Sequence, residues 1–175
     1  MYVPNFITEA EIERVKAELR ILTEQFYSFK LSNFRVVDRF QNVGDIVLLC
    51  EDRSGVSEAL HYELVACMHS MSISSNYLLG RTRKKNPQPL ERAILMTSRY
   101  GSPYVLKKFE PHFTLCAMPP TDSFVRNELV SKPHHTLDNA GLAETELEVD
   151  TLCLLTKSNG ERYWRIVAQY PLCKK

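Results

Sequence analysis

The sequence lacks the glycine-rich motifs through which many enzymes bind nucleotide phosphates. Only six of its 175 residues are glycine, and neither G-x-x-x-x-G-K-S/T nor G-x-G-x-x-G occurs. The G-x-S-x-G motif is missing as well. These absences exclude P-loop hydrolysis of nucleoside triphosphates and Rossmann-type cofactor chemistry, and they argue against a phosphate site built from backbone amides.

The chain also lacks a charge excess and a long apolar run. Lys and Arg number 22 against 21 Asp and Glu, so no basic excess favours nucleic acid as a partner. No apolar stretch approaches the roughly 20 residues of a membrane span, and from the mixed N-terminal residues we expect no signal peptide. With 44% apolar and 25% charged residues, the composition is that of a folded domain. We expect a cytoplasmic, soluble protein with no membrane partner.

Cysteine and histidine show no ligand spacing. None of the five cysteines has a C-x-x-C partner, so we expect reduced, buried thiols rather than a disulfide framework or a zinc site. His61 and His69 are eight residues apart in a predicted helix, without a matching carboxylate pattern. The sequence therefore predicts neither a metal site nor a cofactor.

The first part of the chain predicts one helix, two strands and a second helix. Thr8 and Glu11 form a capping box, followed by apolar residues at helical spacing. The segment 26–37 alternates as a strand, with Phe29 and Leu31 on the apolar face. The remaining predicted elements are a turn at 42–44, a strand at 45–50 and a helix at about 57–71, with Leu60, Leu64, Cys67 and Met68 on one face.

The rest of the chain predicts a mixture of helices and strands after a polar loop at 72–89. The predicted elements are a helix at 89–100, extended segments at 104–106 and 111–118, a helix capped by Thr121 and running to about Val130, and a hairpin of 147–156 with 163–170. Ser158-Asn159-Gly160 is the expected hairpin turn. Together the elements indicate an α+β fold.

Two stretches of the sequence share one plan, which suggests an internal repeat. Residues 1–51 and 115–171 each read as an extended segment, a proline turn, a Thr-capped helix and two strands. Placing Thr8 on Thr121 gives an offset of 113 residues. His112 then corresponds to a position just before Met1.

The segment Pro111-His112-Phe113-Thr114-Leu115 carries the most chemistry. Side chains at i and i+2 of a strand share a face, so His112 and Thr114 project together, and we expect Phe113 and Leu115 to enter the core. Imidazole passes protons near neutral pH, and a threonine hydroxyl can hydrogen-bond a phosphate oxygen. This pair suits phosphate chemistry.

Phe109-Glu110-Pro111-His112-Phe113-Thr114-Leu115 resembles the F-x-P-H-x-T-L signature of the 2H phosphoesterase (2′-5′ RNA ligase-like) superfamily. The segments 100–105 and 163–172 add to the resemblance, particularly to a branch linked to phosphonate metabolism. The resemblance implies a bilobal fold with two antiparallel sheets related by a pseudo-twofold axis. Each lobe supplies one H-x-T/S motif, whose histidines act as general base and general acid. The implied substrates are small cyclic phosphates or 2′,5′-linked nucleotides, cleaved without metal or cofactor.

Two features of the sequence depart from that pattern. No H-x-T/S motif occurs in the first 60 residues, and Ala117 stands where RNA-directed relatives often have a basic residue. We expect a first lobe at roughly 1–71 without its N-terminal strand and a second at roughly 103–175, joined by the polar loop and the short helix. Either the chain starts at an internal methionine, or the first motif is lost. An exposed sheet edge would favour a homodimer. The first hypothesis is an impaired phosphoesterase, and the second is a non-catalytic phosphate- or nucleotide-binding module.

Other residues offer weaker signals. Tyr163 and Arg165 share a strand face that could meet the phosphate or could simply be exposed at the surface, which leaves Trp164 for the core. Arg81 and Arg83, with Lys84 and Lys85, could steer an anion or bind RNA, or could form a solvated loop. His134-His135-Thr136-Leu137 also spells H-x-T-L, but we interpret it as a polar loop after Pro133.

Overall fold

The computed structural model of the chain describes residues 9–40, 45–69, 95–96, 106, 109–116, 122–139, 141, 144–157 and 163–174. The elements follow in the order α1 (Glu9–Thr23), β1 (Phe29–Phe40), β2 (Asp45–Glu51), α2 (Val56–His69), β3 (His112–Cys116), α5 (Ser123–Asn139), β4 (Leu147–Val149), β5 (Thr151–Thr156) and β6 (Arg165–Pro171).

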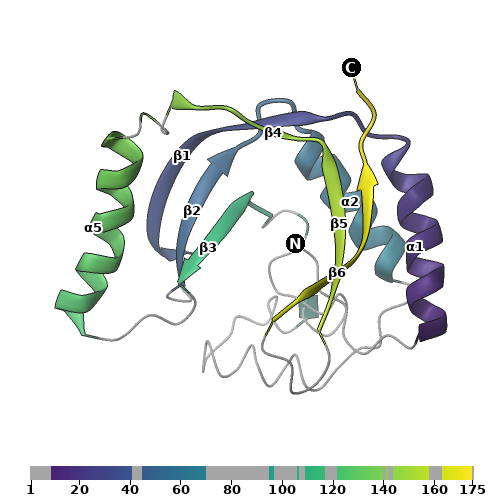
Figure 1. Cartoon of the computed structure of the whole chain (residues 1–175), viewed down its shortest axis with the longest axis horizontal. Coiled ribbons are helices and arrows are strands. Elements are labelled where there is room, and N and C mark those ends of the chain that lie inside the picture. Colours follow the sequence, from purple (N-terminus) through teal and green to yellow (C-terminus); the bar gives the residue numbers. More distant parts are fainter. Residues whose placement is uncertain are drawn as a thin grey trace.

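The strands of this part of the chain form two antiparallel sheets, so the predicted α+β class is confirmed. One sheet has four strands in the order β3-β2-β1-β4, and the other is the β5–β6 hairpin. The four-stranded sheet takes β1 and β2 from the first half of the chain and β3 and β4 from the second. It curls between α5 on one side and α1 and α2 on the other (Figure 1).

The main core lies between α1, α2, the four-stranded sheet and β6. Val15, Leu19 and Leu22 are buried on one side of α1, as their helical spacing predicts. Phe29 and Leu31 of β1 are buried too, which confirms the predicted alternation. The other buried members of this core are Phe34, Cys50, Leu60, Tyr170 and Leu172. Burying each large apolar side chain contributes about 1.5–3 kcal/mol.

The chain contains two helix–hairpin units, α1 with the β1–β2 hairpin and α5 with the β5–β6 hairpin, and the helix of each unit packs against the hairpin of the other. Helix α1 precedes the β1–β2 hairpin but packs against β6, and α5 precedes the β5–β6 hairpin but packs against β1. Arg126 of α5 and Asp38 of β1 form a two-point ion pair, with Arg126 Nε 2.9 Å from Asp38 Oδ2. Each unit therefore covers the sheet of the other.

Helix α5 differs from its prediction at both ends. The expected cap was Thr121, but Asp122 Oδ1 accepts the N–H groups of Phe124 and Val125 at 2.9 and 3.0 Å. The helix also continues past Val130 through Pro133 to Asn139, so the interpretation of 134–137 as a loop was wrong. Proline removes one backbone hydrogen bond inside a helix, but α5 continues through Pro133 and packs against β1.

The C-terminal hairpin is confirmed, with two corrections. The predicted strand 147–156 divides at Asp150 into β4, which pairs with β1, and β5, which pairs with β6. Trp164 was expected in the core but is 49% exposed, because it lies just before β6 rather than within the paired strand.

All five cysteines are free thiols, as expected, although only Cys50 is buried. Among the helices that the structure describes, none is long and apolar enough to cross a membrane. Several predictions lie outside the described residues: the cap at Thr8, the turns at 42–44 and 158–160, the loop at 72–89 and most of the helix at 89–100.

Candidate functional site

His112 and Thr114 lie on the same face of β3, the edge strand of the four-stranded sheet as described. In the β2–β3 register, Leu49 is opposite His112 and Val47 is opposite Thr114. Paired residues of neighbouring strands share a face. The imidazole and the hydroxyl therefore stand side by side, roughly 7 Å apart at their Cα atoms, next to two buried apolar side chains of β2.

The ring of His112 is held by the backbone. His112 Nδ1 lies 2.7 Å from the carbonyl oxygen of Glu110. A carbonyl oxygen can only accept a hydrogen bond, so Nδ1 carries the proton and Nε2 of the neutral ring keeps its lone pair. The side chain is exposed. His112 thus presents one basic nitrogen in a fixed orientation.

The segment leading into β3 is anchored to β2. The N–H of Cys50 donates to the carbonyl oxygen of Pro111 at 3.1 Å, and its thiol donates to the same oxygen at 3.3 Å. Burial raises the pKa of the Cys50 thiol to about 11, so the thiol keeps its proton. Cys50 therefore serves as a structural donor beside the motif.

The burial expected for Phe113 and Leu115 is wrong. These side chains are 43% and 45% exposed, because β3 is a five-residue strand at the sheet edge. Phe113 still contacts the core side of the sheet, with its ring centroid 6.5 Å from that of Phe34. The alternation of faces along β3 was predicted correctly, but its degree of burial was not.

Arg35 was not predicted from the sequence as a residue of the candidate site. A register shift in β1 between Ser32 and Arg35 places Arg35 opposite Leu49, in the same cross-strand row as His112. Asn33, with a φ of 54°, lies within that irregularity. Arg35 is exposed, and two strand spacings of about 4.8 Å separate it from β3. A guanidinium on this face can contact an anion held near His112.

Two of the other predicted substrate-binding residues, Tyr163 and Arg165, are not in this sheet. Arg165 begins β6 and pairs with Thr156 in the two-stranded sheet, and Tyr163 lies two residues before β6 with 70% of its surface exposed. Arg81 and Arg83 lie outside the described residues. A role for these four side chains in substrate binding stays a prediction.

A family model with the description "Protein of unknown function (DUF1045)" matches residues 6–164. The chain belongs to this family. The match includes helices α1 and α5 and the whole of β3, so His112 and Thr114 lie within the DUF1045 region. No curated protein matches the chain. The description of DUF1045 names no activity.

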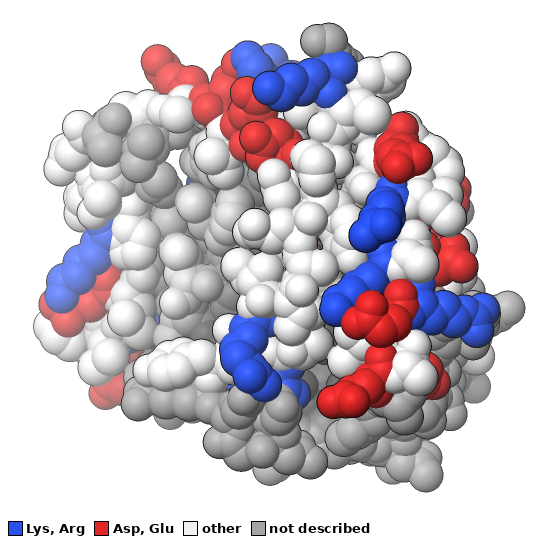
Figure 2. All heavy atoms as spheres, turned by 45° about the vertical axis from the view of Figure 1, so that its right-hand side comes forward, with Lys and Arg blue, Asp and Glu red and all other residues white. Residues whose placement is uncertain are grey.

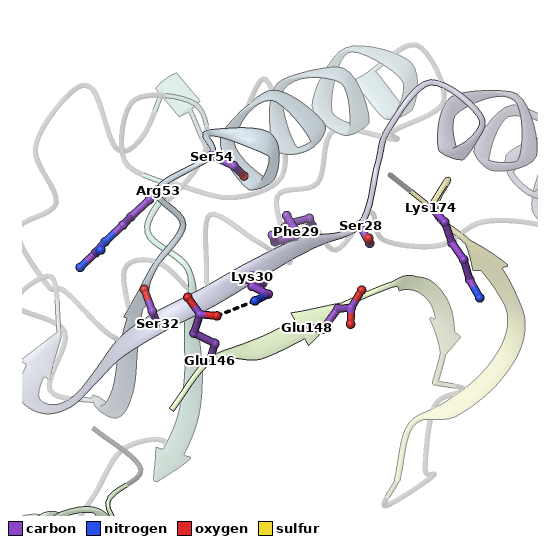
Figure 3. A pocket seen from close by; sticks show the side chains of 9 residues that line it. All are labelled: Ser28, Phe29, Lys30, Ser32, Arg53, Ser54, Glu146, Glu148 and Lys174. Carbon is purple, nitrogen blue, oxygen red and sulfur yellow. Dashed lines mark hydrogen bonds and ion pairs between the residues drawn. The ribbon is translucent and has the colours of Figure 1, made fainter. Parts of the chain in front are cut away.

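The DUF1045 chain also has an open pocket of about 590 Å³ at the other end of the sheet. It is lined by Ser28, Phe29, Lys30, Ser32, Arg53, Ser54, Glu146, Glu148 and Lys174 (Figure 3). Lys30 Nζ lies 2.6 Å from Glu146 Oε2, and the hydrogen bond between them raises the pKa of Lys30 and lowers that of Glu146. Cations and carboxylates therefore offset one another here. Neither His112 nor Thr114 lines the pocket.

The surface of this DUF1045 chain is mixed in charge on the face that Figure 2 displays. Acidic and basic side chains stand side by side at the top of the molecule, where Figure 1 places β4 and the C-terminus. No continuous basic surface is visible among the described residues of this face. The described residues likewise contain no cluster of three or more His, Cys, Asp or Glu that could hold a metal ion.

Proposed function

We propose that this DUF1045 protein is a phosphoesterase of the 2H type that acts on a cyclic phosphate or a 2′,5′-linked phosphodiester. The observation that carries the proposal is the fixed orientation of His112, with Nδ1 on the Glu110 carbonyl and Thr114 on the same strand face. The F-x-P-H-x-T-L resemblance supports the same reading. DUF1045 would then be a branch of the 2H phosphoesterases.

In the proposed reaction, water attacks phosphorus and gives its proton to Nε2 of His112. One P–O bond forms, and the P–O bond to the leaving alkoxide breaks. The hydroxyl of Thr114 donates to a non-bridging phosphate oxygen, and Arg35 offsets the negative charge on the phosphate. The leaving oxygen takes a proton from a second acid, which the resemblance assigns to a second H-x-T/S motif, or from water.

General acid–base help contributes roughly two to four orders of magnitude per group. A chain with one of the two histidines would therefore retain phosphate binding and part of the rate. Its substrate would be a small phosphorylated compound or nucleotide. The mixed charge on the face in Figure 2 gives no support to a long RNA as the ligand.

The test compares the wild-type chain with His112→Ala on 2′,3′-cyclic nucleotides and 2′,5′-linked dinucleotides, with a chelator and no added metal. We expect the substitution to lower turnover at least 100-fold. His135→Ala is the matched control, because His135 is an exposed histidine on α5. Equal turnover by the wild type and the His112 variant would overturn the proposal.

A second candidate function is a phosphate- or nucleotide-binding module without turnover. It is favoured by the neighbours of the pair on this face: Leu49 and Val47 on β2, then Arg35 and Val37 on β1, none of which can supply the second proton-transfer group. This reading predicts binding of 2′,3′-cyclic nucleotides that is lost in His112→Ala, in a wild-type chain that does not cleave them.

A further inference from the structure

A second histidine, His61 of α2, is buried beside the segment that leads to His112. Its side chain is 4% exposed, and its ring stacks on Phe109 with centroids 4.2 Å apart and planes 12° from parallel. His61 Nε2 accepts the backbone N–H of Leu106 at 3.0 Å. Two of its contacts therefore reach the segment before β3.

The N–H of Leu106 belongs to a residue in an uncommon conformation. Leu106 has a φ of 57°, which leucine rarely adopts because its Cβ crowds the backbone. The sequence pattern predicted an extended conformation at 104–106, and this was wrong at Leu106. The carbonyl of Leu106 accepts the N–H of Phe109 at 2.8 Å, so Leu106 and Phe109 close one turn. The hydrogen bond from Leu106 to His61 stabilises that turn.

The turn continues directly into the contacts that hold His112. The next carbonyl after Phe109 is that of Glu110, which accepts the Nδ1–H of His112. The carbonyl that follows belongs to Pro111 and accepts both donors of Cys50. His61 on α2 and Cys50 on β2 therefore hold the two ends of a short segment whose middle carbonyl orients the His112 ring.

We infer that His61 is a positioning residue for His112, acting through Leu106, Phe109 and the Glu110 carbonyl. The inference deepens the proposed function and, for its catalytic consequence, rests on it. For this role His61 must be neutral, with its proton on Nδ1, because an imidazolium cannot accept a hydrogen bond. Burial lowers the pKa of His61 to about 4, which agrees with a neutral ring at physiological pH.

Two substitutions separate the two contacts of His61. His61→Phe keeps an aromatic ring to stack on Phe109 but loses the acceptor for Leu106, whereas His61→Gln keeps an acceptor oxygen near the position of Nε2 but loses the ring. Long-range ¹H–¹⁵N spectra of the histidine rings report the tautomer of His112 in the free protein. We expect His61→Phe to lower the population of the Nδ1–H form of His112, with a smaller change in His61→Gln.

Turnover of a 2′,3′-cyclic nucleotide is the second measurement. A small displacement of a catalytic group costs up to roughly 100-fold in rate, so we expect His61→Phe to lower kcat about tenfold or more. His61→Gln should recover most of that loss. His135→Phe places the same new side chain on an exposed site of α5 and should change neither the His112 tautomer nor kcat.

The spectra decide the inference independently of the proposed function, because they need no substrate. A folded His61→Phe chain with the wild-type His112 tautomer would overturn the positioning role, whatever the activity. If His61→Phe does not fold, Phe109→Leu removes the stacked ring from the other side, and an unchanged His112 tautomer in that variant would overturn the role equally. A wild-type chain whose turnover does not depend on His112 would overturn the proposed function and leave the positioning result standing.

Discussion

The ring of His61 lies nearly parallel to the ring of Phe109, 4.2 Å away, and this contact joins helix α2 to the segment before β3. The stack covers one face of an imidazole that is almost fully buried. Since the ring also accepts a backbone hydrogen bond, protonation would remove an acceptor and place a charge in a desolvated site. The contact therefore couples the fold to the protonation of His61.

The unfolding free energy should fall between pH 6.5 and about pH 4 because of His61. Burial lowers the folded-state pKa of His61 from 6.5 to about 4. In this range the unfolded chain binds a proton that the folded chain does not. The stabilisation from neutral His61 is therefore fully present above pH 6.5, the pKa of His61 in the unfolded chain, and it is lost as the pH falls toward 4. Because of His61, we expect the free energy of unfolding to be about 1–2 kcal/mol lower at pH 5 than at pH 7.5. Urea unfolding at the two pH values measures this difference.

His61→Gln provides the comparison, because glutamine does not titrate. Its unfolding free energy should change less than that of the wild type over the same pH range, by about the same 1–2 kcal/mol. Parallel pH profiles for the two chains would mean that His61 titrates normally in the folded state.

Much of the fold follows from local patterns that survive in the structure. The 3.6-residue spacing of Val15, Leu19 and Leu22 predicted the buried side of α1, and alternation at Phe29 and Leu31 predicted the inner face of β1. These patterns are local, so they do not depend on the order of the strands in the sheet. Helix α5 was predicted too short, because Pro133 and the histidines after it are weak helix formers, and the packing against β1 that retains them is not a local property.

Only part of the candidate site could be predicted from the sequence. His112 and Thr114 could be named because residues at i and i+2 of a strand share a face. The row from His112 through Leu49 to Arg35 depends on two strand registers and an irregularity at Asn33. Likewise, the role of His61 depends on the N–H of Leu106, which is 45 residues away in the chain. No spacing rule connects such distant positions.

Thr114 should contribute to phosphate binding through its hydroxyl alone. Thr114→Val keeps the shape of the side chain without the hydroxyl, whereas Thr114→Ser keeps the hydroxyl. A hydrogen bond to a charged group contributes about 1.5–3 kcal/mol, so we expect Thr114→Val to weaken kcat/KM for a 2′,3′-cyclic nucleotide about 10- to 100-fold. Because Thr114 is exposed, both variants should unfold at the wild-type urea concentration. Equal kcat/KM for Val and Ser would remove Thr114 from the site.

The ion pair of Arg126 with Asp38 should stabilise the packing of α5 on β1. Its side chains are 14% and 33% exposed, and the guanidinium donates to both carboxylate oxygens, a geometry that lysine cannot reproduce. We therefore expect Arg126→Lys and Arg126→Ala both to lower the Tm. A more exposed pair of the same charges occurs on α5 itself, where Lys132 and Glu128 lie 3.7 Å apart with 73% and 49% exposure.

Lys132→Ala is the control for Arg126→Ala, because both remove a cation from α5, and exposed helix pairs contribute little. We expect its Tm to stay at the wild-type value. In a double-mutant cycle, Asp38→Ala should have a smaller effect in the Arg126→Ala background than in the wild type, since the partner is already gone. Additive effects would show that the two side chains stabilise α5 and β1 separately.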